Sequence, residues 1–125
     1  MNLAAIAIVC LGGALGAVTR YWATRWGAHL LPSTDFPFPT LFVNLSGSAL
    51  LGVVFGLTSP DFTQVIDAPI LLFAGVGFCG AYTTFSSFCT ETITLIARSG
   101  PQAALYILAT VAGSITAFAI SFALL

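Results

Sequence analysis

The chain has 125 residues, of which 58% are hydrophobic and only 6% are charged. A soluble domain carries about 25% charged residues, so this composition excludes a water-soluble globule and argues against a soluble enzyme. Three dispersed arginines, no lysine and a formal net charge of −1 also exclude a basic surface for nucleic acid.

Four apolar segments are long enough to cross a bilayer, whose hydrocarbon core of about 30 Å requires about 20 helical residues. They run over residues 2–22, 39–57, 68–97 and 101–125 and predict an all-α membrane protein with one four-helix domain. The first segment lacks the basic start of a cleavable signal peptide, so we expect it to remain as a membrane helix. A polar turn, SPDFTQVIDAP, is expected between the second and third segments, and the short RSGP connection makes the third and fourth antiparallel neighbours.

Two of these segments carry small or polar residues at four-residue intervals, which places them on one helix face. The second segment carries Asn44, Ser48, Gly52 and Gly56, and the fourth carries Tyr106, Thr110 and Ser114, with Thr116 slightly off the repeat. A hydroxyl in a membrane helix often bonds only its own backbone. Simple packing and the lining of a pore are therefore both open interpretations of these stripes.

The third segment would extend about 45 Å as one helix, which is too long for an untilted span. Its middle, GFCGAYTTFSSF, combines glycines, adjacent threonines and serines, which weaken a helix. We predict a mid-membrane break within residues 80–86, and an intact helix with back-bonded hydroxyls is the alternative. Broken backbone at this depth must be buried in protein or line a cavity, where its carbonyls can bind a small cation.

Phe85 and Phe88 follow this region three residues apart, on one helix face close to Ser87 and Glu91. Such a pair is normally core packing, but the edge of a phenyl ring is positive. Rings presented edge-on beside hydroxyl and amide donors can hold a small anion weakly enough to release it. Glu91 is the only acid well inside a segment, and an intramembrane carboxylate is a candidate for function.

Three stretches of the sequence, GGALGAVTRYW, FPFPTLFVNLSGSALLG and GFCGAYTTFSSF, closely resemble the signatures of the Fluc (CrcB) family of fluoride channels. The resemblance covers essentially the whole chain. It implies a passive, fluoride-selective channel in the plasma (inner) membrane of a prokaryote, which exports cytoplasmic fluoride and relieves its toxicity. It also implies an antiparallel, dual-topology homodimer with two pores and a structural sodium ion at the central interface.

The resemblance further implies a role for individual residues. Phe85 and Phe88 would form aromatic boxes along the pore, which Asn44 would line with its amide. Arg20 would lie by an aqueous vestibule, and the backbone carbonyls of Gly80 and Thr83 from each subunit would hold the sodium. The remaining expected pore residues are Ser87, Glu91, Tyr106, Thr110, Ser114 and Thr116. Serine replaces an expected threonine at Ser87 and threonine a commoner serine at Thr110, and both keep the hydroxyl.

Two other functions fit a four-helix membrane protein. A proton-coupled exporter of the small multidrug type would use Glu91 in an aromatic cavity, and a non-transporting subunit would be held by its GxxxG contacts. The charges bear on orientation, because alternating spans place Arg20, Arg25 and Arg98 on one side of the membrane. This bias argues mildly against antiparallel pairing.

Overall fold

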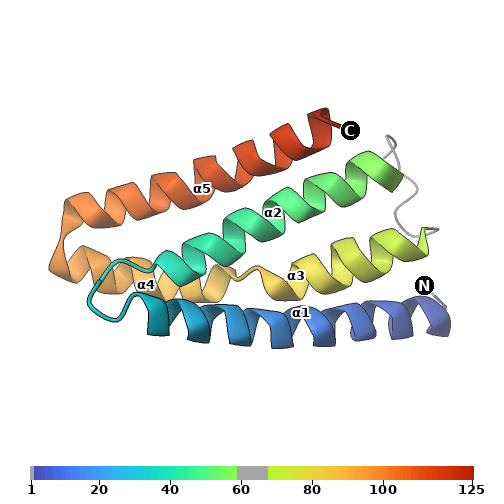
Figure 1. Cartoon of the computed structure of the whole chain (residues 1–125), viewed down its shortest axis with the longest axis horizontal. Helices are drawn as coiled ribbons and strands as arrows, with labels where there is room; N and C mark the ends of the chain where they lie inside the picture. Colours follow the sequence, from blue (N-terminus) through green and yellow to red (C-terminus); the bar gives the residue numbers. More distant parts are fainter. Residues whose placement is uncertain (1, 59–67) are drawn as a thin grey trace.

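The computed structural model describes residues 2–58 and 68–125, and all the regular structure within these ranges is helical (Figure 1). The elements, in chain order, are α1 (Leu3–Leu30), α2 (Phe38–Thr58), the π-helix η2 (Leu71–Cys79), α3 (Gly80–Tyr82), α4 (Phe85–Arg98) and α5 (Gly100–Ala123). With η2, α3 and α4 forming one span, the described residues contain four helices long and apolar enough to cross a membrane. The predicted all-α, four-helix membrane fold is confirmed. The polar turn expected between the second and third spans falls largely on residues 59–67, outside the described residues.

The four spans lie side by side, with both chain termini toward one end and the α1–α2 and α4–α5 connections at the other (Figure 1). Helix α1 packs mainly on η2 and α3, and α2 packs mainly on α5. Glycines permit both approaches. A Cβ at Gly77 would lie 2.7 Å from the Val9 carbonyl oxygen, and a Cβ at Gly52 would collide with the Phe118 carbonyl. Gly77 and Gly52 therefore serve packing within one subunit.

Helix α1 extends eight residues beyond the predicted end at residue 22 and stops at Leu30. The prediction ended the helix where the apolar run ends, but polar and aromatic side chains do not break a helix. The first residue that does is Pro32. Gly27 allows the extension to pack closely, because a Cβ at this position would lie 2.9 Å from Cγ of Pro39 at the start of α2.

The predicted break in the third span is present and is narrower than the expected residues 80–86. Only Thr83 (φ −77°, ψ 160°) and Thr84 (φ −146°, ψ 124°) are extended, since α3 continues to Tyr82 and α4 begins at Phe85. The glycine at the start of the region stays helical, and the two adjacent β-branched residues are the ones that leave the helix. Thr84 then becomes the N-cap of α4, where its hydroxyl accepts a hydrogen bond from the Ser87 N–H at 3.3 Å.

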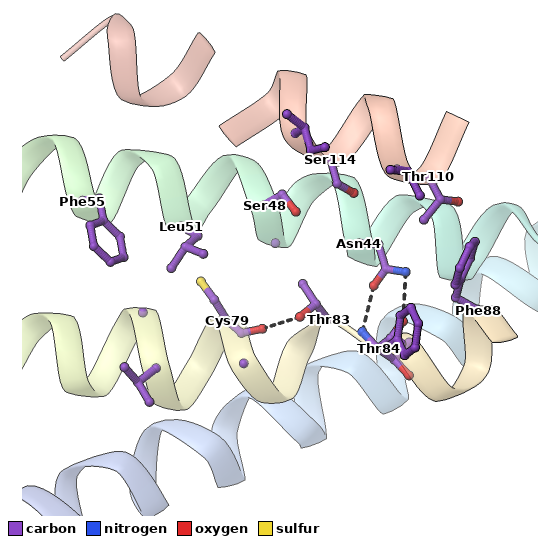
Figure 2. A pocket seen from close by; sticks show the side chains of 17 residues that line it. Asn44, Ser48, Leu51, Phe55, Cys79, Thr83, Thr84, Phe88, Thr110 and Ser114 are labelled. Carbon is purple, nitrogen blue, oxygen red and sulfur yellow. Dashed lines mark hydrogen bonds between the residues drawn. The ribbon is translucent and has the colours of Figure 1, made fainter. Parts of the chain in front are cut away.

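The side chain of Asn44, from α2, supplies the partners that the Thr84 backbone loses at the break. Its Oδ1 accepts a hydrogen bond from the Thr84 N–H at 2.8 Å, and its Nδ2 donates to the Thr84 carbonyl at 3.0 Å (Figure 2). Both residues are buried. Because an unpaired backbone group in this environment is costly, this pair of bonds, which we call the Asn44 latch, stabilises the break and fixes it against α2.

We expect Asn44→Leu to lower the midpoint of thermal unfolding in detergent, measured by scanning fluorimetry. The substitution leaves a buried N–H and a buried C=O without partners, at about 1–3 kcal/mol each. Ser48→Ala is the matched control, because Ser48 lies one turn further along α2 and lines the same groove but is no part of the latch. A midpoint for Asn44→Leu equal to that of Ser48→Ala would contradict a stabilising role for the latch.

Candidate functional site

An open groove of about 550 Å³ lies between α2, α5 and the broken third span. Its lining is mostly apolar, with Leu51, Phe55 and Cys79 toward one end, and its polar groups gather near the break (Figure 2). The residues predicted from sequence that line this groove are Asn44, Gly80, Thr83, Phe85, Phe88, Thr110 and Ser114. The fold therefore brings together, from three separate segments, most of the side chains expected to line a pore.

The hydroxyl of Thr110 is the one buried side-chain polar atom in the described part of the chain that has no hydrogen-bond partner. Thr110 is 7% exposed and lies on α5, near Asn44 and one turn before Ser114 (Figure 2). A buried hydroxyl without a partner costs about 1–3 kcal/mol, and such a group in a native protein requires an explanation. Thr110 lines the groove, so a change of its χ1 rotamer would turn the hydroxyl toward a bound ligand or water.

The two phenylalanines beside the break differ in their surroundings. Their ring centroids are 5.8 Å apart with an interplanar angle of 38°, so they share a helix face as predicted. Phe88 is half-buried and packs on Tyr106, with ring centroids 5.4 Å apart. Phe85, the first residue of α4, is 77% exposed. One subunit therefore packs one side of the Phe88 ring, against Tyr106, but leaves the ring of Phe85 uncovered.

Glu91 does not line the groove and is held by two hydroxyl groups. Thr40 Oγ1 donates to Glu91 Oε1 at 2.8 Å, and the Tyr106 hydroxyl donates to Oε2 at 2.7 Å. Tyr106 is fully buried, and its ring meets that of Phe36 edge-on. The carboxylate thus joins α4 to α2 and α5, in an arrangement that we call the Glu91 clamp.

Arg20 reaches the break from α1. Its Nη1 donates to the Thr83 carbonyl at 3.1 Å, while the Thr83 hydroxyl donates to the Cys79 carbonyl at 2.9 Å. The Gly80 carbonyl loses its usual helical donor, since the N–H four residues on belongs to Thr84 and is taken by Asn44. The break therefore presents two carbonyls with remaining acceptor capacity, at Gly80 and at Thr83.

Ser87 and Thr116 lie away from the main polar cluster. Ser87 lies in the first turn of α4, where its Oγ accepts from the hydroxyl of the N-cap Thr84 at 3.2 Å. Thr116 is exposed and lines a second, shallow groove of about 500 Å³ on another face of α5. It lies two positions after Ser114, a rotation of about 200° around the helix axis, so one subunit does not place it on the same track as Thr110.

Sequence reasoning missed Thr40 and Thr84, which complete the Glu91 clamp and the Asn44 latch. The sequence contained an indication of the role of each residue. Thr40 precedes Asn44 by four residues and therefore extends the polar stripe of α2 by one turn. Thr84 directly precedes α4, a position where threonine is a favoured N-cap.

Comparison of the sequence with known proteins places the chain in a family. The family model described as CrcB-like protein, Camphor Resistance (CrcB), matches residues 7–122. A fluoride-specific ion channel, FluC 1 of Halalkalibacterium halodurans, is 41% identical over 117 residues, which cover 92% of each chain. The fluoride-specific ion channel FluC of Anaeromyxobacter sp. strain K is 40% identical over 116 residues, covering 92% of this chain and 90% of the relative.

A third similar protein comes from an archaeon. The fluoride-specific ion channel FluC of Pyrococcus horikoshii is 43% identical over 97 residues, covering 77% of this chain and 74% of the relative. Together with four apolar helices of spanning length, relatives in bacteria and archaea make this a multi-pass protein of the prokaryotic inner membrane. The match over nearly the full length shows that the chain belongs to the CrcB family.

Proposed function

We propose that the protein is a passive, fluoride-selective channel that exports cytoplasmic fluoride and so relieves its toxicity. The observation that carries the proposal is the buried, unpartnered hydroxyl of Thr110 in a groove that also holds the Asn44 amide and Phe88. Two relatives that are about 40% identical to this chain are named as fluoride-specific ion channels, and these names agree with the proposal.

Neutral donors suit the transport of a small anion. Fluoride gives up its water only where closely spaced donors replace it, and the groove offers hydroxyls, an amide and phenyl edges. The Asn44 Nδ2 carries two N–H groups, and the latch uses only one of them with the Thr84 carbonyl. No lysine is present in the chain. An ion held without a full positive charge leaves readily, as conduction requires.

We propose that two subunits form the channel as an antiparallel homodimer. A single subunit leaves the groove open and the Phe85 ring 77% exposed. In a bilayer, lipid tails would then face the hydroxyls, which they cannot satisfy. A second copy would cover this face, and a two-fold axis would give two equivalent ion paths. Antiparallel insertion would also place the arginines of the two subunits on opposite sides of the membrane, so that the dimer as a whole carries no arginine bias.

The Glu91 clamp weighs against a proton-coupled exporter. Such a protein needs a carboxylate that a substrate can reach, whereas both oxygens of Glu91 already accept hydroxyl hydrogens from Thr40 and Tyr106. In the channel we assign Glu91 a place beside the path, where it orients Tyr106 against Phe88. The polar track on α5 then continues from Tyr106 to Thr110 and Ser114.

We also propose that a sodium ion, held by the Gly80 and Thr83 carbonyls of both subunits, ties the dimer together. Three features support the fit of these groups. The Gly80 carbonyl has lost its helical donor, a Cβ at Gly80 would meet no atom within 4 Å, and both residues line the open groove. Carbonyl oxygens without carboxylates suit a monovalent cation. The Thr83 carbonyl accepts from Arg20 with one lone pair and would offer the ion its second, and the guanidinium charge would repel a divalent ion twice as strongly as a monovalent one.

The function is tested by fluoride flux from liposomes containing the purified protein, with efflux started by valinomycin and followed by a fluoride electrode. We expect rapid fluoride efflux without any proton gradient, and much slower chloride efflux, because a larger halide does not fit the same closely spaced donors. Equal rates for the two halides, or fluoride movement that requires a proton gradient, would contradict the proposal.

The same assay locates the ion path. Thr110→Val keeps the side-chain shape and removes the hydroxyl, so we expect fluoride flux to fall about 2- to 10-fold, the effect of one lost hydrogen bond. Thr19→Val is the matched control, since it makes the same change at an exposed hydroxyl of α1 that bonds the Leu15 carbonyl of its own helix. Equal losses in the two variants would mean that the main groove is not the path.

Dual orientation is tested by labelling one thiol. Gln102→Cys, at the exposed start of α5, is made in a chain that lacks Cys10, Cys79 and Cys89. We expect a membrane-impermeant maleimide to label about half of the molecules from each side of the membrane, because antiparallel partners place this residue on opposite sides. Labelling from one side alone would favour the orientation that the three arginines suggest.

Sodium is tested by its removal. We expect exchange into N-methyl-D-glucamine buffer to lower the thermal midpoint of the dimer, and sodium to restore it where calcium and magnesium do not. The physical reason is that binding to the folded dimer alone stabilises it by mass action. An unchanged midpoint after rigorous sodium removal, or equal rescue by calcium, would refute the assignment while leaving the fluoride proposal standing.

A further inference from the structure

Gly47, on α2, faces the break in the third span and is buried against it. It lies three residues after Asn44, which places the two residues on the same side of the helix, about one turn apart. A Cβ at Gly47 would collide with Cγ2 of Thr83 and would lie 3.0 Å from Cδ1 of Tyr82. The absence of a side chain therefore leaves a notch in α2 that receives the Thr83 methyl group. We call it the Gly47 notch.

The side chain of Thr83 is held at both of its ends. Its hydroxyl donates to the Cys79 carbonyl at 2.9 Å (Figure 2), and its methyl group lies in the Gly47 notch. Serine has no methyl group and valine has no hydroxyl, so threonine is suited to make both contacts. A β-branched side chain has few χ1 rotamers, and two fixed ends leave Thr83 with a single one.

The Thr83 carbonyl depends on these contacts because the helical ladder does not hold it. The N–H four residues on, at Ser87, bonds to the Thr84 hydroxyl instead. Arg20 donates to the Thr83 carbonyl at 3.1 Å. Thr83 is thus fixed by three elements, with α1 on its carbonyl, α2 on its methyl group and η2 on its hydroxyl.

We propose that Gly47 is a positioning residue, which fixes the direction of the Thr83 carbonyl by receiving the Thr83 methyl group. The inference rests on the proposed sodium site, in which that carbonyl is a ligand, and adds the residue that holds the ligand in place. Ligands keep a productive geometry when other groups lock their conformation. Gly47 acts through Thr83 and needs no contact with the ion. With the Asn44 latch one turn away, α2 then orients both extended residues of the break.

The inference is tested by measuring the thermal midpoint of the intact protein over a range of sodium concentrations, with N-methyl-D-glucamine as the replacing cation. We expect Gly47→Ala to raise the sodium concentration for half-maximal stabilisation about 10-fold or more, the effect that loss of a supporting contact has at metal sites. Gly52→Ala is the matched control, because its Cβ collides with the Phe118 carbonyl, between α2 and α5. It should lower the midpoint at every sodium concentration and leave the half-maximal concentration unchanged.

A second substitution separates positioning from general overpacking. Thr83→Ser removes the methyl group and keeps the hydroxyl, so the notch has room for a Cβ. In the Thr83→Ser background we expect Gly47→Ala to change the half-maximal sodium concentration by less than about twofold, because contacting residues are coupled. Thr83→Ser alone creates no collision and remains measurable if Gly47→Ala does not assemble. It should also raise the half-maximal concentration, since it empties the notch.

Three results would overturn the inference, and they differ in what else they affect. If sodium stabilises the wild type and Thr83→Ser leaves the half-maximal concentration unchanged, the notch does not position the ligand and the sodium site still stands. If the effect of Gly47→Ala persists in the Thr83→Ser background, it does not pass through the methyl group. If the wild type does not respond to sodium, the inference and the sodium site fail together, and fluoride efflux decides the channel function separately.

Discussion

Two extended residues in the middle of a membrane span persist only if other groups replace their lost helical hydrogen bonds, and the Asn44 latch does this for Thr84. The rest of the candidate site depends on this replacement. It fixes α2 against the third span and lets the Thr84 hydroxyl cap α4. It also releases the Gly80 carbonyl and starts α4 at Phe85. One amide therefore determines where both the phenyl rings and the freed carbonyls lie.

Most other polar groups near the break have partners within the subunit. Arg20 bonds to the Thr83 carbonyl, and Glu91 accepts from two hydroxyls. Burial in a low-dielectric interior makes such pairing obligatory. The unpartnered Thr110 hydroxyl is an exception within the described residues, and it lies in the groove. A site for a ligand is most readily recognised in this way, as the point where an otherwise satisfied polar network is incomplete.

Composition and spacing were sufficient to predict the four spans, the break and the shared face of Phe85 and Phe88, because each is a local property. Adjacent threonines weaken a helix wherever they occur, and a three-residue interval gives one helix face in any fold. The end of α1 was predicted too early, because an apolar run marks the hydrocarbon core and not the end of a helix. The partners of Asn44, Arg20 and Glu91 are 40, 63 and up to 51 residues away in the chain. Only tertiary packing decides such pairs.

The charges of the described residues are separated from the groove, and this separation has a consequence for an anion path. Arg98 ends α4 and pairs with Asp35 in the loop before α2, and Arg25 bonds to Tyr21 on α1. Glu91 is in its clamp, and Arg20 is directed to the backbone of the break. A guanidinium facing the groove would bind a small anion tightly and slow its release, whereas a carboxylate there would repel it. With both kinds of charge engaged elsewhere, the groove retains hydroxyl, amide and phenyl-edge donors. Such donors can replace the water around an ion without trapping it.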